Sequence, residues 1–74
     1  MIEEDDNTIL KCDVELNVAA PSMAVANKWI ADALRRAAAM VETGQLDDGF
    51  HDVTDGAGKK IGEIYVDYST EIVI

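Results

Sequence analysis

Residues 8–18 carry the most regular alternation of hydrophobic and polar side chains in the chain. The hydrophobic side chains occupy the even positions: Leu10, Cys12, Val14, Leu16 and Val18. The polar side chains occupy the odd positions: Lys11, Asp13, Glu15 and Asn17. Because successive side chains of a strand point to opposite faces, this pattern predicts a strand with one buried and one solvated face. Cys12 falls on the apolar face, so we expect a small core residue rather than a reactive thiol.

The pattern that follows is typical of an amphipathic helix running from Ser22 to about Thr43. Pro21 interrupts the strand, and the Ser22 hydroxyl is suited to accept a hydrogen bond from the first turn. Gly44 is suited to end the helix, because glycine readily adopts the left-handed conformation found there. The expected buried stripe comprises Met23, Ala26, Ile30, Ala33, Leu34, Ala37, Met40 and Val41. Trp29 lies at the edge of this stripe, where it either folds over the rim of the core or belongs to an interface.

Two short strand patterns, residues 50–54 and 60–68, follow a loop at residues 45–49. The glycine-rich segment 55–58 between them is a turn signal, so the pair predicts a β-hairpin. In the second strand, Ile61 is out of phase with Ile64. Gly62 lies between them, and a β-bulge there would bring both isoleucines to the same face. The apolar residues 70–74 either extend this strand or form a short fourth one.

The order strand, helix, strand, strand predicts a single α+β domain over residues 8–74. A right-handed crossover through the helix makes the first two strands parallel. The hairpin then places the last strand between them. The expected fold is therefore a three-stranded antiparallel sheet of order 1-3-2, with the helix on one face. Residues 1–7, which include four acidic side chains, are expected to form a flexible acidic tail.

The charge balance limits the kinds of partner that the protein can have. The chain has 15 acidic and 6 basic residues, a net charge of −9. Such a charge disfavours direct contact with nucleic-acid phosphates or an anionic membrane and suits either solubility or a partner with a basic surface. The single cysteine and the acidic N-terminus, which does not resemble a secretory signal, favour a cytoplasmic location. No apolar run approaches the ~20 residues of a membrane span.

Two groups of residues are candidates for binding a protein partner. The first lies on the predicted solvated face of the sheet: Asp13, Glu15, Glu63, Tyr65 and Asp67. Carboxylates on neighbouring strands repel one another, and a basic partner would relieve that repulsion. The second group combines the rim of the helix with the loop before the hairpin: Trp29, Asp47 and Asp48. The alternative for the first group is a merely solvated face.

The residue patterns of catalysis and metal binding are not found. His51 is the only histidine, so a histidine pair for a metal or a catalytic triad cannot form. The acidic residues near it do not follow the spacing of a calcium loop. The segment 55–60 lacks the spacing of a phosphate-binding loop and is not followed by a helix pattern. We therefore expect a protein without catalytic residues, metal or cofactor.

Two segments resemble a group of small, uncharacterised proteins encoded by phages and mobile elements. They are residues 34–44, which end at the helix-terminating glycine, and residues 53–66, which include the hairpin. The hairpin residues that carry the resemblance are Asp55, Gly58, Ile61, Gly62 and Glu63. The resemblance covers roughly residues 30–68. It implies a phage-borne inhibitor of host defence of the kind that includes anti-CRISPR proteins, and it assigns no catalytic residue.

Three functions are consistent with these patterns. The first is a non-enzymatic inhibitor that occupies a basic or nucleic-acid-binding surface of a host complex, in the host cytoplasm if the protein is phage-encoded. The second is a dimeric protein that binds a small nucleotide signal. The third is an antitoxin-like or structural partner that pairs through a strand edge, for which the apolar residues 72–74 are a candidate. The sequence leaves open whether the protein is a monomer or a homodimer.

Overall fold

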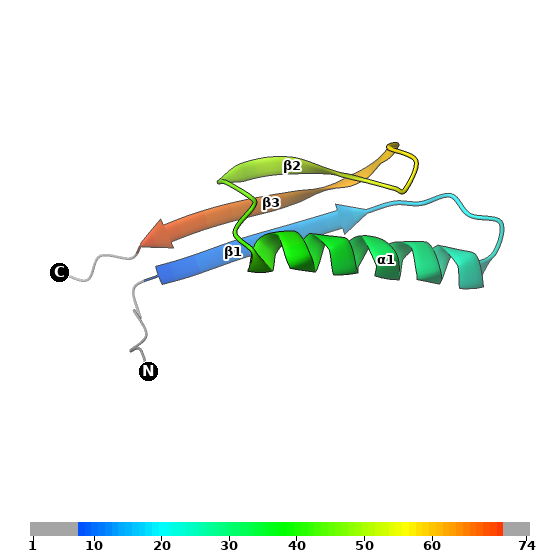
Figure 1. Cartoon of the computed structure of the whole chain (residues 1–74), viewed down its shortest axis with the longest axis horizontal. Coiled ribbons are helices and arrows are strands. Elements are labelled where there is room, and N and C mark those ends of the chain that lie inside the picture. The colour runs from blue at the N-terminus through cyan, green and yellow to red at the C-terminus, as the bar shows by residue number, and fades with distance from the viewer. Residues whose placement is uncertain (1–7, 71–74) are drawn as a thin grey trace.

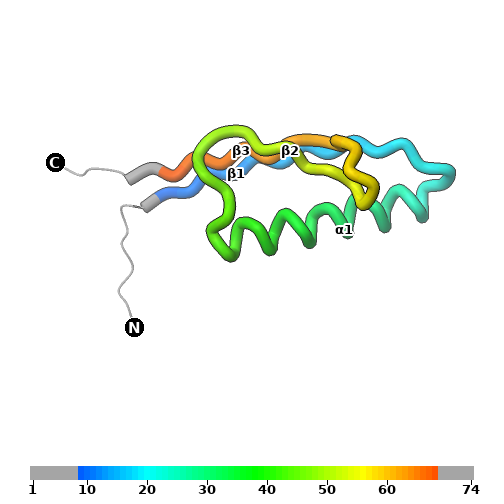
Figure 2. The backbone as a smooth tube through the Cα atoms, turned by 45° about the horizontal axis from the view of Figure 1, so that its top comes forward, coloured from blue at the N-terminus to red at the C-terminus, as the bar shows by residue number. Residues whose placement is uncertain are grey.

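A computed structural model describes residues 8–70 and confirms the predicted architecture (Figure 1). The elements are β1 (Thr8–Leu16), α1 (Met23–Glu42), β2 (Gly49–Thr54) and β3 (Lys60–Thr70). The strands form one antiparallel sheet of order β1-β3-β2, and α1 lies on one face of it (Figure 2). The acidic tail predicted for residues 1–7 lies outside the described residues. The predicted C-terminal strand also does, apart from Thr70, which ends β3.

The helix begins and ends where its capping residues indicated. The Ser22 hydroxyl accepts a hydrogen bond from the Val25 N–H at 3.2 Å. At the other end, the Gly44 N–H donates to the Val41 carbonyl and the Gln45 N–H donates to the Met40 carbonyl. These two bonds form a Schellman motif, which requires a left-handed residue, and Gly44 supplies it with φ +71°.

The predicted bulge is confirmed in the hairpin. The pairing of β2 with β3 shifts by one residue between Val53 and Thr54, so that Ile61 is the extra residue on β3. Both Ile61 and Ile64 are buried as a result. Gly62 follows Ile61 and lies against β1. A Cβ atom at this position would overlap the Glu15 carbonyl oxygen and lie 2.9 Å from the Leu16 Cα, so only glycine lets the two strands approach so closely.

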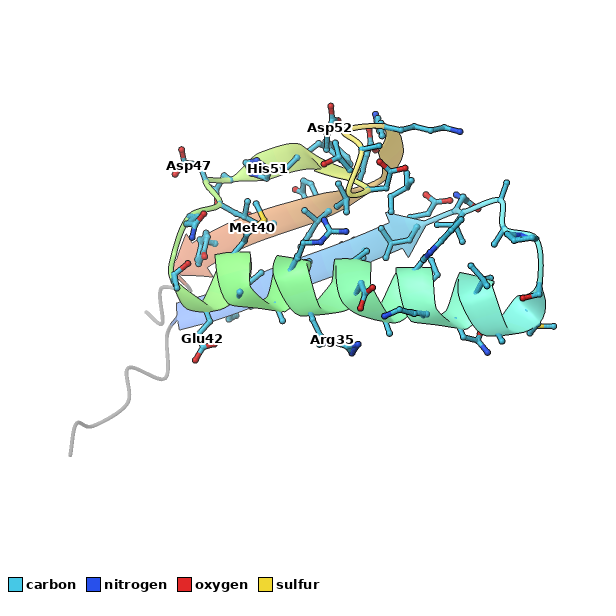
Figure 3. All side chains as sticks on the ribbon, turned by 45° about the vertical axis from the view of Figure 1, so that its right-hand side comes forward. Arg35, Met40, Glu42, Asp47, His51 and Asp52 are labelled. Atoms are coloured by element: carbon cyan, nitrogen blue, oxygen red, sulfur yellow. The ribbon has the colours of Figure 1, made fainter. Side chains whose placement is uncertain are left out.

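The core lies between α1 and the β2–β3 hairpin. Its buried side chains are Ala33, Ala37, Leu46, Val53, Ile61, Ile64 and Val66. Figure 3 shows Met40 between α1 and the sheet, whereas Arg35 and Glu42 point away from it. The two alanines place small side chains at the contact, which lets the helix pack close to the sheet. None of these seven buried residues comes from β1, although the partly buried Leu16 at its end packs against them.

The expectation that Cys12 is a core residue is wrong, because its side chain is exposed. Its neighbours on the same face of β1 are also exposed, Leu10 at 42% and Val14 at 41%. The register places this face on the helix side of the sheet, since Cys12 is opposite Val66 and Val14 is opposite Ile64. The strand pattern therefore identified the apolar face correctly. The helix leaves much of that face uncovered, because α1 packs over the β2–β3 hairpin and the first half of β1 also runs past the C-terminal end of α1 (Figure 1).

Candidate partner-binding surface

The sheet face turned away from α1 presents side chains in rows that cross the three strands. Glu15 is opposite Glu63, Asp13 is opposite Tyr65, and Lys11 is opposite Asp67. The hairpin extends two of these rows, since Asp52 is opposite Glu63 and Phe50 is opposite Tyr65. We call this surface the open face: Lys11, Asp13, Glu15, Phe50, Asp52, Glu63, Tyr65 and Asp67. All five residues of the first predicted group lie on it, and Figure 3 shows Asp52 pointing away from the helix.

An aromatic pair occupies the middle row of the open face. The rings of Phe50 and Tyr65 have centroids 4.8 Å apart and are tilted by 44°. Phe50 is 70% exposed, which is unusual for a large apolar side chain. A shallow hollow of about 270 Å³ lies beside this pair, and the side chains of Asp13, Glu15 and Glu63 contribute to its lining. Aromatic rings flanked by carboxylates attract the guanidinium or ammonium group of a basic side chain.

The charges of the open face are only partly compensated within the chain. The Lys60 ammonium lies 3.2 Å from the Asp52 carboxylate and 3.0 Å from the Glu63 carboxylate. The hydrogen bonds to Glu63 and Asp52 raise the pKa of Lys60. Lys11 lies 3.8 Å from the Asp13 carboxylate. No salt bridge within the described part of the chain reaches Glu15, although it stands directly opposite Glu63. Like charges in this arrangement destabilise a sheet, so a cation placed between them would be favoured.

The structure does not bring together the second predicted group. Asp47 and Asp48 belong to the loop that follows the C-terminal end of α1, and Figure 3 shows Asp47 at that end of the molecule. Trp29 belongs to the N-terminal half of α1. The Asp48 carboxylate accepts a hydrogen bond from the Tyr68 N–H at 2.8 Å, which ties the loop to β3. The Asp47 carbonyl oxygen is in hydrogen-bond contact with the His51 ring. These contacts hold the loop in place.

Trp29 instead lines a cavity of about 320 Å³ between α1, the hairpin turn and the segment after β1. Two cationic side chains, Arg36 and Lys59, belong to the same lining. Arg36 donates one hydrogen bond to the Thr54 carbonyl at 2.8 Å. Within the described residues, neither Arg36 nor Lys59 forms a salt bridge. The cavity therefore combines an indole ring, 43% exposed, with two cations that have no acidic partner in contact.

The two carboxylates of this cavity already have hydrogen-bond or ionic partners. Asp32 lies 3.5 Å from the Lys28 ammonium and 3.2 Å from the Arg35 guanidinium. Asp55 accepts hydrogen bonds from the Ala57 and Lys59 N–H groups, both at 2.9 Å. The bond from Lys59 is the main reason that the pKa of Asp55 is lowered. The cavity is thus better suited to a small anion than to a cation.

Phe50, together with Asp52, is a member of the open face that the sequence pattern did not single out. It stands at the start of a short strand whose clearest hydrophobic position is Val53, which is buried. The pairing of Phe50 with Tyr65 depends on the bulge between the two strands. Alternation within the segment 50–54 places Phe50 and Asp52 on the face opposite Val53. That alternation was the signal in the sequence from which Phe50 and Asp52 could have been assigned to the open face.

Comparison with protein-family models, with curated proteins and with solved structures gave no match. Among residues 8–70, no three metal-binding side chains lie close enough together to hold a metal ion. The described helix is not apolar enough over a sufficient length to cross a membrane.

Proposed function

We propose that the protein acts by binding, without catalysis, and that its open face docks on a surface of a partner protein rich in arginine and lysine. The observation that carries this proposal is the exposed Phe50–Tyr65 pair set among carboxylates, two of which, Glu15 and Glu63, oppose each other across the sheet. An apolar centre with a charged rim is the usual anatomy of a protein interface.

The two parts of the open face contribute differently to binding. An arginine of the partner that stacks on Tyr65 or Phe50 gains cation–π energy, of about 0.5–2 kcal/mol depending on how far the contact is desolvated. The carboxylates around it attract basic side chains and, with the net charge of −9, accelerate the encounter with a basic surface. The aromatic centre supplies affinity, and the acidic rim supplies rate and selectivity.

The inhibitory role implied by the resemblance is one form of this proposal. Surfaces that bind nucleic acid are rich in arginine and lysine, because those side chains neutralise phosphates. A small acidic domain docked on such a surface would exclude the nucleic acid by competition. Inhibition is then expected to weaken as salt is raised, since both the attraction and the steering are screened.

The proposal is tested with a defined arginine-rich peptide as the probe, followed by NMR titration and calorimetry. We expect shifts to concentrate at Phe50, Tyr65 and Glu63. The double variant Glu15→Gln/Glu63→Gln should bind roughly tenfold more weakly, which corresponds to about 1.4 kcal/mol. The control Asp32→Asn/Glu42→Gln removes the same charge from α1 and should change affinity far less. An equal loss in both double variants would show attraction by net charge alone and would contradict a binding site on the open face.

The cavity at Trp29 favours a second candidate function, binding of a small planar anion such as a nucleotide. Its support is the combination of an indole ring with Arg36 and Lys59 in one lining. Trp29 is the only tryptophan, so its fluorescence reports directly on this cavity. Adenosine monophosphate should quench that fluorescence in the native protein and in Arg35→Gln, and should do so much less in Arg36→Gln. No quenching in the native protein would eliminate this candidate.

A further inference from the structure

The free edge of β1 offers a full set of backbone hydrogen-bonding groups. The Asn17 N–H donates to the Ile61 carbonyl at 2.7 Å. In an antiparallel pair, positions that bond to the neighbouring strand recur at every second residue. The odd positions of β1 therefore bond to β3, and the even positions direct their N–H and C=O groups outward. Within residues 8–70, no strand pairs with this edge.

The side chains at these even positions form an exposed apolar row. Leu10, Cys12 and Val14 lie on the helix side of the sheet, and all three are exposed. A solvent-facing apolar row on a nine-residue edge strand is the arrangement that leads strands to pair. The β2 edge contrasts with it, because β2 has six residues and a register shift before its last one.

Leu34 of α1 extends the apolar row. Arg36 reaches the Thr54 carbonyl, so its flank of the helix faces β2. Leu34 lies about 100° around the axis from the buried Ala33, on the opposite flank, which faces the free edge of β1. It is 45% exposed. Since Leu34 is eight residues before Glu42, or about 12 Å along the axis, it is level with the second half of β1, which α1 runs alongside (Figure 1).

We propose that a second copy of this chain covers this edge, with the two β1 strands antiparallel about a two-fold axis at Cys12. In this register Cys12 is opposite the partner's Cys12. Leu10 is opposite the partner's Val14, and Lys11 is opposite the partner's Asp13. Because Cys12 directs its backbone groups outward, the central pair exchanges two hydrogen bonds, as an antiparallel ladder requires.

The centre of the resulting interface is self-complementary on both faces of the sheet. On the helix side, Leu10 of one copy enters the apolar space between Val14 and Leu34 of the other, and the symmetry repeats this contact. On the open face, Lys11 and Asp13 stand opposite residues of the other sign in the partner. These charged positions form pairs without backbone bonds, in which opposite side chains approach most closely. The isologous contact closes as a dimer and leaves no further edge of this kind.

The dimer does not depend on the proposed function, and the two are expected to respond to salt in opposite directions. It joins the open faces of two copies into one six-stranded surface. Salt should favour the dimer, because it screens the repulsion between two chains of net charge −9. Salt should weaken binding of a basic partner for the same physical reason. Measuring dimer formation and binding of the basic partner across a series of salt concentrations therefore shows whether one of them is lost while the other is kept.

The register is tested by exchanging charges across the two-fold axis. In Lys11→Asp, the new aspartate faces the partner's Asp13, so two acidic side chains are opposite each other. In Asp13→Lys, the new lysine faces the partner's Lys11, so two basic side chains are opposite each other. By sedimentation velocity at concentrations up to about 1 mM, the native protein should form a dimer and each variant alone should be at least about tenfold weaker in association. The two variants mixed should form a heterodimer, because every opposed pair then combines opposite signs. Circular dichroism checks that both variants stay folded. We expect them to fold, because the side chains of Lys11 and Asp13 are exposed.

Cys12 provides an independent test of the same register. A short bismaleimide should link two native chains through Cys12, because antiparallel partners at bonded positions have Cα atoms about 5.5 Å apart. The matched control places the cysteine at the other edge, as Asp52→Cys in a Cys12→Ser background, and should give little cross-linked dimer at the same concentration. A native protein that stays monomeric up to about 1 mM would overturn the proposal. A dimer that both charge variants form as well as the native chain would also overturn it.

Discussion

The two edges of the sheet differ in how completely this chain covers them. Beside β2, α1 and the loop after it bury Val53 and Leu46, and Arg36 binds the Thr54 carbonyl. Beside β1, the apolar row stays exposed although its alternation is the more regular of the two. A hydrophobic pattern thus indicates which face of a strand is suited to burial, but it does not identify the molecule that buries that face.

The contrast is sharpest at two residues that stand opposite each other. Val14 on β1 and Ile64 on β3 form one cross-strand pair on the helix side of the sheet. Ile64 is 2% exposed and Val14 is 41% exposed. One pair thus spans the boundary between the core and the uncovered edge.

Gly62→Ala should have the largest effect, because β1 leaves no room for a Cβ atom at Gly62. The added methyl group would overlap the Glu15 carbonyl, so β1 must move away or the domain must unfold. We expect a loss of roughly 3 kcal/mol or more. Gly56→Ala is the control, because its Cβ would meet nothing within 4 Å, and a change within about 0.5 kcal/mol is expected. Urea denaturation measures both, and equal stability of the two variants would contradict the close approach.

Ile64→Ala and Val14→Ala should separate the core from the uncovered edge. Removing the buried Ile64 side chain creates a cavity and should cost about 2–5 kcal/mol at any protein concentration. Truncating the exposed Val14 should cost less than about 1 kcal/mol in dilute protein. If a second copy covers Val14, the cost of Val14→Ala should rise with protein concentration. A concentration-independent cost for Val14→Ala would count against the dimer while leaving the fold intact.

Arg36→Ala and Arg35→Ala compare the flank of α1 that faces β2 with the side of α1 that points away from the sheet (Figure 3). Arg36→Ala removes the bond to the Thr54 carbonyl and should cost about 0.5–1.5 kcal/mol by thermal denaturation. Arg35→Ala removes an exposed contact with Asp32 on the same helix and should change stability by less than about 0.5 kcal/mol. Equal effects would mean that the Arg36 bond does not join α1 to the hairpin.

Asp55→Asn should have the smallest effect and a defined pH dependence. The turn N–H groups hold the pKa of Asp55 below its ordinary value of 3.8. The carboxylate therefore stabilises the fold above about pH 4, and this contribution is lost as the pH falls through the lowered pKa. The native protein should be slightly more stable than Asp55→Asn near neutral pH, and the two should converge in acid. Urea midpoints measured across this range check the sign, and a gap that widens in acid would contradict it.

Much of the fold could be predicted from local sequence patterns. The Ser22 and Gly44 caps determine the ends of α1, and the parity break between Ile61 and Ile64 indicated the bulge. The exposure of Cys12 could not be predicted, because it depends on where α1 ends relative to β1. The placement of α1 relative to β1 results from long-range packing, which the alternation within one strand does not encode.

The open face was predicted in part for a similar reason. Asp13, Glu15 and Tyr65 follow from the alternation of their own strands. The contact of Phe50 with Tyr65 requires the register of the hairpin, and the bulge changes that register by one residue. The grouping of Trp29 with the loop carboxylates assumed that the helix rim and the loop meet. The helix instead continues for 13 residues after Trp29, to Glu42, or about 20 Å along the axis, which keeps Trp29 and Asp47 well apart.

Amide hydrogen exchange along β1 tests most directly whether a second copy covers this edge. The N–H groups of Lys11 and Asp13 bond to β3, whereas those of Leu10, Cys12 and Val14 point outward. In dilute protein only the first set should be protected from exchange. At high concentration both sets should be protected, and the Asp13→Lys variant alone should again leave the outward set unprotected. Rapid exchange of Leu10, Cys12 and Val14 at every concentration would contradict the dimer.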